Sequence, residues 1–158
     1  MIPALLPLPP GEGRGEGIPA PGIQLQPVIL DTNIVLDAFV FNDPTAEPIR
    51  QSLAKQELDW LATQPMRDEL IRVLAYPKIA ARLAFYKLSA SDVLAGFDQH
   101  VCIVDVAPKA SLTCSDADDQ KFIDLAIQHR ALLLSKDRDV LSMKKRLLAM
   151  GIRAQAAM

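Results

Sequence analysis

The chain contains few of the residues that mark metal-thiolate sites. Its 158 residues include two cysteines and two histidines. Cys102 and Cys114 are too widely spaced to form a close ligand pair, and only His100 and His129 could complete a site with them. A zinc site is therefore disfavoured, and free thiols in a reducing compartment are the better interpretation.

Long hydrophobic runs are also absent. No stretch approaches the roughly 18 consecutive apolar residues that a membrane-spanning helix needs. The apolar N-terminal segment, MIPALLPLPP, lacks basic residues and is interrupted by four prolines, so it is a poor signal peptide. We therefore expect a soluble, cytoplasmic protein with no membrane partner.

The sequence has no excess of positive charge. It holds 17 basic and 19 acidic residues, which gives a net charge of −2 and a pI near 5.6. Any contact with a nucleic acid must then use a local basic face, or metal ions that bridge to phosphate.

Half of the residues are hydrophobic, which is enough for one domain with a core. Residues 1–26 are rich in proline and glycine and show no periodicity, so they are predicted to form a flexible arm. The alternative is a polyproline segment that docks on a partner. Residues 27–158 are predicted to form the folded domain.

Within that domain, short apolar runs alternate with amphipathic segments. The alternation predicts an α/β fold with three layers, α/β/α, and a mainly parallel central sheet. The predicted strands are residues 27–30, 58–62, 100–106, 131–134 and 152–154. The predicted helices are residues 34–39, 45–55 (with Thr45 as the cap), 65–75, 78–87, 89–97, 118–129 and 140–150.

Two of the predicted strands lead directly to an aspartate. Asp31 follows the first strand and Asp137 follows the fourth. If these strands are parallel neighbours, both carboxylates lie on the same rim of the sheet, where α/β proteins bind ligands. A helix start would add Asp119, and the edge of a helix face would add Glu69. The alternative is that Asp31 or Asn33 only caps a helix.

Four converging carboxylates would be hard oxygen ligands. Such a set suits Mg²⁺ or Mn²⁺ better than zinc. Crowded negative charges repel one another, so the arrangement needs a cation to neutralise it. The chemistry that this predicts is hydrolysis of a phosphodiester with a metal-activated water.

Three segments carry a specific resemblance. ILDTNIVLDAF, PMRDELIRVLAYPKI and CSDADDQKFIDLAIQHRALLLSKDRDVL resemble, in order, the successive motifs of the PIN domain family, in particular the toxins of toxin–antitoxin systems. The resemblance covers residues 28–154. It implies a Mg²⁺- or Mn²⁺-dependent ribonuclease with an RNA substrate, a small antitoxin protein as partner, and a homodimer by analogy.

The resemblance also assigns roles to residues. Asp116 and Asp139 are second choices as metal ligands, and Asn33 and Ser135 match the small polar residues that accompany the first and fourth acids. The implied catalytic metal ligands are Asp31, Glu69, Asp119 and Asp137.

Most of these acids have a simpler interpretation as well. Asp116 and Asp118 favour the N-terminus of the following helix through its dipole, and Asp139 could cap the last helix. Asp124 fits a solvated or supporting group better than a ligand. Glu69 alone would be an ordinary surface glutamate.

Lys136 departs from the family pattern, in which a glycine or asparagine often precedes the fourth acid. It either contacts phosphate or reduces the negative charge of the site. With it, Arg138, Lys144, Lys145 and Arg146 form a basic cluster that is either a solvated helix face or a guide for RNA. With five phenylalanines, two tyrosines and one tryptophan, the chain favours contacts to the RNA backbone over base stacking.

The sequence thus predicts a metal-dependent endoribonuclease. The rival interpretation is a catalytically silent PIN-like module that binds RNA or a protein partner. A phosphatase of the haloacid dehalogenase type would need a second aspartate where this chain has Asn33.

Overall fold

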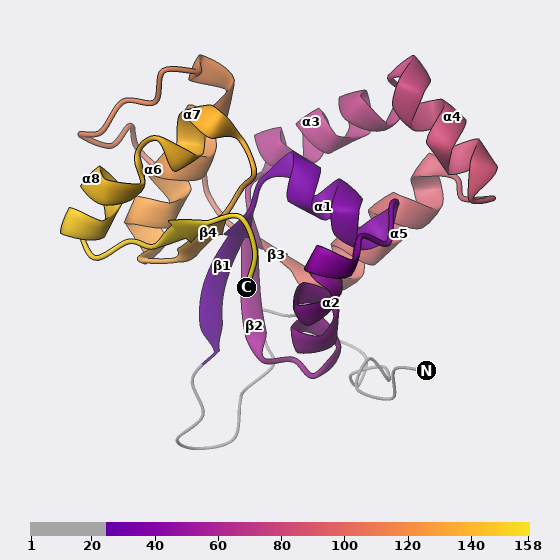
Figure 1. Ribbon diagram of the computed structural model, residues 1–158, viewed down its shortest axis with the longest axis horizontal. Helices are drawn as coiled ribbons and strands as arrows, with labels where there is room; N and C mark the ends of the chain where they lie inside the picture. The colour runs from indigo at the N-terminus through magenta and orange to yellow at the C-terminus, as the bar shows by residue number, and fades with distance from the viewer. Residues whose placement is uncertain (1–24) are drawn as a thin grey trace.

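The computed structural model describes residues 25–158, which form one five-stranded sheet whose strands are all parallel (Figure 1). The predicted arm, residues 1–26, lies outside the described residues except at its end, where Gln26 already belongs to the first strand. The strand order is β3-β2-β1-β4-β5. The strands are β1 (Gln26–Leu30), β2 (Leu58–Ala62), β3 (Val101–Ile103), β4 (Leu132–Leu134) and β5 (Ala154–Gln155).

Helices cover both faces of the sheet, so the predicted three-layer α/β/α fold is confirmed. Figure 1 shows α1 to α5 on one side and α6 to α8 on the other. None of the helices among residues 25–158 combines the length and apolar character that a membrane span requires. The helices are α1 (Thr32–Phe39), α2 (Glu47–Ala54), α3 (Gln64–Leu74), α4 (Pro77–Phe85), α5 (Ala90–His100), α6 (Gln120–His129), α7 (Arg138–Leu141) and α8 (Lys144–Ala149).

The order of the strands reverses at β1, the central strand. β2 and β3 follow on one side of it, whereas β4 and β5 lie on the other. Right-handed crossovers then place the connecting helices of the two halves on opposite faces. A crevice is expected at the carboxyl end of β1, where the connections diverge. Asp31 is the first residue beyond that end.

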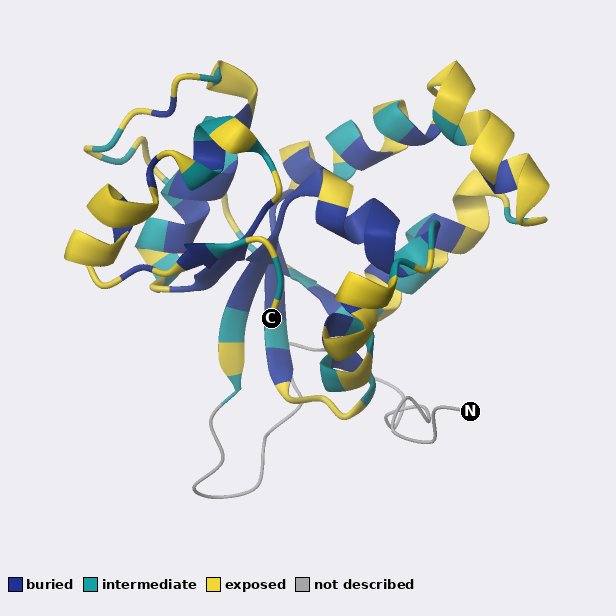
Figure 2. Ribbon diagram, viewed as in Figure 1, coloured by how far each residue is buried: buried dark blue, intermediate teal, exposed yellow. Residues whose placement is uncertain are grey.

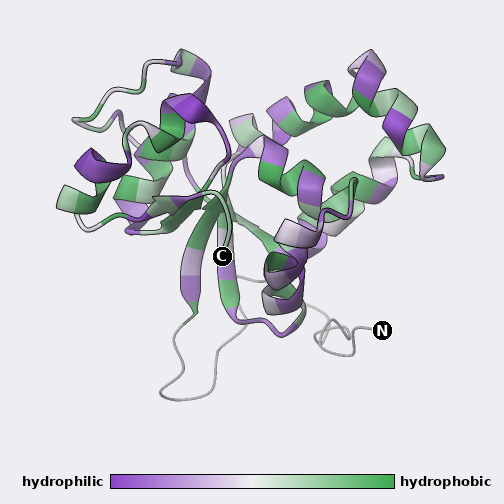
Figure 3. Cartoon of the chain, in the orientation of Figure 1, coloured by the Kyte–Doolittle hydropathy of each residue, from purple (hydrophilic) through white to green (hydrophobic). Residues whose placement is uncertain are grey.

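The central strands are hydrophobic because both of their faces are covered. Val28, Ile29 and Leu30 of β1 are buried, as are all three leucines of β4. The two strands are in register from Val28, opposite Leu132, to Leu30, opposite Leu134. Figure 3 shows hydrophobic residues along the inner part of the sheet, whereas on the helices they alternate with hydrophilic ones.

An aromatic group anchors β2 to the helices. Trp60 is almost fully buried, and its ring stacks on Phe39 of α1 with 5.8 Å between ring centroids. It also meets Phe97 of α5 edge to face at 4.9 Å. By contrast, α4 is mostly exposed, and Phe85 at its end retains 77% of its accessible surface (Figure 2).

Two predicted helices are each divided in two. Residues 45–55 form the 3-10 turn η2 (Pro44–Ala46) and then α2, and the cap is Asp43 rather than Thr45, because the Asp43 carboxylate accepts the Thr45 N–H at 2.9 Å. Residues 140–150 are interrupted between α7 and α8. There the Ser142 hydroxyl donates to the carbonyl of Asp139 at 2.9 Å, a bond that competes with regular helix pairing.

Removing the branched side chain of Ile29 should destabilise the whole fold, because this residue is completely buried in the central strand. Ile29→Ala is expected to lower the free energy of unfolding by about 2–5 kcal/mol. Ile71→Ala, at a position that is 41% exposed, is the matched control and should change it by no more than about 0.5 kcal/mol. Urea denaturation measures both, and equal losses in the two variants would contradict this account of the core.

Candidate functional site

Asp31 and Asp137 are brought together by the ends of two neighbouring parallel strands. The Asp31 N–H extends the ladder between β1 and β4 by donating to the carbonyl of Leu134 at 3.0 Å. Ser135, which is fully buried, joins the two aspartates. Its hydroxyl donates to Asp31 Oδ2 at 2.6 Å and accepts the backbone N–H of Asp137 at 3.0 Å.

The alternative that Asp31 only caps a helix does not describe its side chain. Asp31 occupies the N-cap position of α1, but its carboxylate makes no capping hydrogen bond. The N–H of Asn33 lies near enough to favour the charged form of Asp31 without capping the helix. The carboxylate is instead bonded to Ser135, on a different strand end.

Asp119 completes a group of three carboxylates. It ends the 3-10 turn η3 (Ala117–Asp119), directly before α6, and it is only 7% exposed. One carboxylate oxygen from each of Asp31, Asp119 and Asp137 lies within 4.8 Å of the other two. Asp119 Oδ2 is buried and has no hydrogen-bond partner among residues 25–158, which is unfavourable for a carboxylate unless a cation satisfies it.

The pKa values of two of these acids reflect the crowding. Burial raises the pKa of Asp31, and the charges of Asp137 and Glu69 add to the shift, while the hydroxyl of Ser135 opposes it. Burial, together with the charges of Asp31 and Asp137, raises the pKa of Asp119 to about 8. Without a cation, it is therefore unfavourable for all three acids to be charged at the same time.

The donor set matches a hard divalent cation. The group consists of carboxylate oxygens alone, without a histidine or a cysteine. Oxygen-only sets of this kind suit Mg²⁺ and Mn²⁺ and do not suit zinc. The buried, unpartnered oxygen of Asp119 is the atom whose surroundings call most strongly for a cation.

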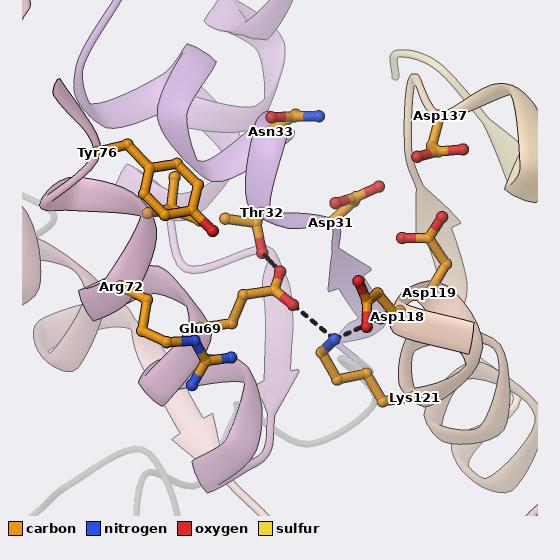
Figure 4. A pocket seen from close by; sticks show the side chains of 11 residues that line it. Asp31, Thr32, Asn33, Glu69, Arg72, Tyr76, Asp118, Asp119, Lys121 and Asp137 are labelled. Carbon is orange, nitrogen blue, oxygen red and sulfur yellow. Dashed lines mark hydrogen bonds and ion pairs between the residues drawn. The ribbon is translucent and has the colours of Figure 1, made fainter. Parts of the chain in front are cut away.

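Glu69 lies in the same cavity but outside this group of three. It projects from α3, and both of its carboxylate oxygens already have partners. Oε1 forms an ion pair with Lys121 Nζ at 2.6 Å, and Oε2 accepts the hydroxyl of Thr32 (Figure 4). The structure therefore separates Glu69 from the other three predicted metal ligands.

The cavity has a volume of about 460 Å³ and is open to solvent. Figure 4 shows the side chains that line it. Five acidic residues and two basic residues line it, so its local charge is negative. The lining residues are Asp31, Thr32, Asn33, Glu69, Arg72, Val73, Tyr76, Asp118, Asp119, Lys121 and Asp137.

The two second-choice acids form a further group with Asp119, again within 4.8 Å. Asp116 caps η3 by accepting the N–H of Asp118 at 2.9 Å. Asp139 accepts the hydroxyl of Ser115 at 2.9 Å. The cap of α7 is Asp137, not Asp139, and neither second-choice acid lines the cavity.

Other predicted supporting residues have separate positions. Asn33 is exposed and lines the cavity. Lys136 does not line it, and its Nζ pairs with Oδ2 of the buried Asp37 on α1 at 2.5 Å. Asp124 accepts the N–H of Ala110 at 2.9 Å, which ties down a loop. The other residues of the predicted basic cluster lie outside the cavity lining: Arg138, Lys144, Lys145 and Arg146.

Four polar cavity residues have no role in the sequence prediction: Thr32, Arg72, Tyr76 and Lys121. Arg72 stands three residues after Glu69 and so shares a helix face with it, which is a signal that the sequence contains. Thr32 stands within the DTN motif. Lys121 gives no such signal, because its partner Glu69 comes from a distant helix.

Comparison with known protein families matches residues 27–139 to the PIN domain, and the chain belongs to this family. PIN domains are generally nucleases that act on nucleic acids, and they typically use divalent metals. A search of curated proteins found no match to the chain. The cluster of acids at the carboxyl ends of β1 and β4 fits the metal site of such a domain.

Neutralising Asp119 should flatten the dependence of stability on pH. With its pKa raised to about 8, the folded protein keeps a proton that the unfolded chain, with an aspartate pKa near 4, releases. The free energy of unfolding of the wild type therefore falls as the pH rises from about 4 to about 8. In Asp119→Asn this loss should be smaller, and the variant should melt above the wild type at pH 8.

Thermal melts in EDTA across this pH range measure the effect. The control is Asp118→Asn, which alters the exposed neighbour. Melting curves of wild type and Asp119→Asn that shift in parallel with pH would show that Asp119 does not carry the repulsion.

Removing the hydroxyl of Ser135 should weaken metal binding without removing a carboxylate. Ser135→Ala loses the bond to Asp31 and the bond from the Asp137 N–H. Loss of such supporting bonds typically weakens metal affinity by about 10–100-fold. Calorimetric titration with Mn²⁺ tests this, with Ser52→Ala as the control because Ser52 lies beside the amino ends of β1 and β2. Unchanged affinity in Ser135→Ala would contradict the supporting role.

Proposed function

We propose that this protein is an endoribonuclease that hydrolyses RNA phosphodiester bonds with the help of Mg²⁺ or Mn²⁺. The observation that carries the proposal is the group of three carboxylates within 4.8 Å, lining an open cavity of about 460 Å³. One of the three, Asp119, has a buried oxygen without a partner. Membership of the PIN domain family supports the nuclease class.

Asp31, Asp119 and Asp137 would hold the ion, directly or through water. A bound divalent ion polarises a phosphoryl oxygen and lowers the pKa of an attacking water. One of the three acids would accept the proton of that water through a carboxylate oxygen that does not bind the ion. The water oxygen bonds to phosphorus as the bond to the leaving ribose oxygen breaks, and that oxygen takes up a proton.

The toxin role rests on the resemblance of the three motifs to the toxins of toxin–antitoxin pairs. A small antitoxin would be the protein partner, the cytoplasm the location, and a homodimer the assembly. The exposed apolar side chains of Ile71, Tyr76 and Phe85 on and beside α3 and α4 offer a surface for a protein contact. An open reading frame for a small protein directly upstream of this gene would support the assignment.

One observation favours the catalytically silent binding module as a second candidate. Both oxygens of Glu69 are occupied, by Lys121 and Thr32, so this acid does not stand ready to bind an ion. Under this alternative, the purified protein binds RNA or a protein partner and cuts no RNA with Mg²⁺ or Mn²⁺.

Asp31→Asn should abolish metal-dependent cleavage of RNA, because it removes one of the three carboxylates of the group. Since the loss of mere supporting groups costs about 10–100-fold, the loss of a ligand should reduce the rate by roughly 100-fold or more. The assay uses a mixed, labelled RNA pool with EDTA, Mg²⁺ or Mn²⁺. Asp105→Asn, at an exposed position outside this cavity, is the matched control.

Cleavage by the wild type and the control, but not by Asp31→Asn or in EDTA, is the expected result. Equal cleavage by all three proteins would indicate a contaminating nuclease, and no cleavage by any of them would favour the binding module.

A further inference from the structure

Lys121 and Glu69 meet across the cavity from opposite sides of the fold. Glu69 belongs to α3 and Lys121 to the first turn of α6, and Figure 4 shows their charged ends joined. The two side chains are mostly buried, with 24% of Lys121 and 19% of Glu69 exposed. This ion pair is therefore an organised part of the cavity wall, unlike a mobile pair at the surface.

The partners of Glu69 differ in kind from those of the three aspartates. Glu69 has a cation on one carboxylate oxygen and a hydroxyl donor on the other. Asp119, in contrast, has a buried oxygen that no donor in the described part of the chain reaches. The uncompensated negative charge that a metal ion would neutralise therefore lies at the aspartates, while the charge of Glu69 is already balanced by Lys121.

Lys121 has bonding capacity left over. A lysine ammonium carries three N–H donors. Among residues 25–158, Lys121 Nζ bonds to two acceptors, the carboxylate of Glu69 and the backbone carbonyl of Asp118. It also lies 4.9 Å from the ring centroid of Phe122, an interaction that needs no hydrogen-bond acceptor. One N–H is therefore available to a ligand in the cavity that Lys121 lines.

We propose that Lys121 binds a phosphate group of the RNA strand and that Glu69 is a positioning residue that holds Lys121, instead of a metal ligand. A metal ion held by the aspartates and the ammonium of Lys121 would then both contact the same stretch of backbone. Arg72, on the same face of α3 as Glu69, adds a second cation to this wall. The inference rests on the proposed function for the identity of the strand.

A phosphate is the ligand that fits this arrangement. Acidic residues outnumber basic ones in the cavity lining, so an anionic strand enters against a repulsive field. A fixed ammonium with a free donor offsets that repulsion locally and gives a charge-assisted hydrogen bond to a phosphate oxygen. Such a bond carries no sequence information, since it reads only the backbone.

Binding of a short, labelled, single-stranded RNA in EDTA tests the role of Lys121 without any cleavage. Fluorescence anisotropy at several low salt concentrations gives the affinity and its dependence on salt. Lys121→Met should bind more weakly than the wild type, and the slope of log K against log salt should shrink by roughly 0.7, because one phosphate is no longer neutralised. Lys55→Met, an equal charge change at an exposed site outside the cavity, should keep the wild-type slope.

A double variant separates phosphate binding from simple charge balance. If Lys121 serves only to neutralise Glu69, then Glu69→Gln combined with Lys121→Met restores the RNA affinity of the wild type. The proposal predicts that the double variant stays as weak as Lys121→Met. It also predicts that Lys121→Arg, which keeps the cation, retains most of the binding. Restored affinity in the double variant, or no RNA binding by the wild type at low salt, overturns the proposal.

Metal titration tests the role of Glu69. Glu69→Gln should weaken Mn²⁺ binding by less than about tenfold, whereas Asp119→Asn should weaken it by about 100-fold or more. Equal losses in the two variants would make Glu69 a ligand and overturn its positioning role. If the wild type binds RNA through Lys121 but neither binds Mn²⁺ nor cuts RNA, the proposed nuclease function fails while the role of Lys121 stands.

Discussion

Electrostatic repulsion among Asp31, Asp119 and Asp137 is the constraint on which the rest of the site depends. Their carboxylate oxygens lie within 4.8 Å of one another in a largely buried setting. Without a cation, taking up a proton relieves such a group, and the raised pKa values of Asp31 and Asp119 reflect this. A divalent ion removes the same repulsion and supplies chemistry as well.

The fold keeps the acids together despite this repulsion. Asp31 and Asp137 are fixed by the parallel register of β1 and β4 and by the hydroxyl of Ser135 between them. The pair between Lys136 and Asp37 ties the loop after β4 to α1, which gives Lys136 a structural role. The folded scaffold thus holds like charges closer together than they would lie in an unfolded chain in water.

The sheet and most of the acids could be predicted from the sequence because both follow from local signals. Buried strands are continuous apolar runs, and an aspartate directly after such a run in a parallel sheet must lie on the ligand-binding rim. The partnership of Lys121 with Glu69 could not be predicted in this way, since it depends on how α3 and α6 face each other across the crevice. Lys144, Lys145 and Arg146 of the predicted basic cluster lie outside the cavity lining because α8 packs beside β5, at the edge of the sheet.

The central claim is that a divalent cation binds among the three aspartates. Anomalous diffraction from crystals grown with Mn²⁺ tests it most directly. The account predicts one strong peak at about 2.0–2.3 Å from oxygens of Asp31, Asp119 and Asp137, with Glu69 still paired to Lys121. A peak bound by Glu69 but not by Asp119, or no peak in this cavity at saturating Mn²⁺, would contradict it.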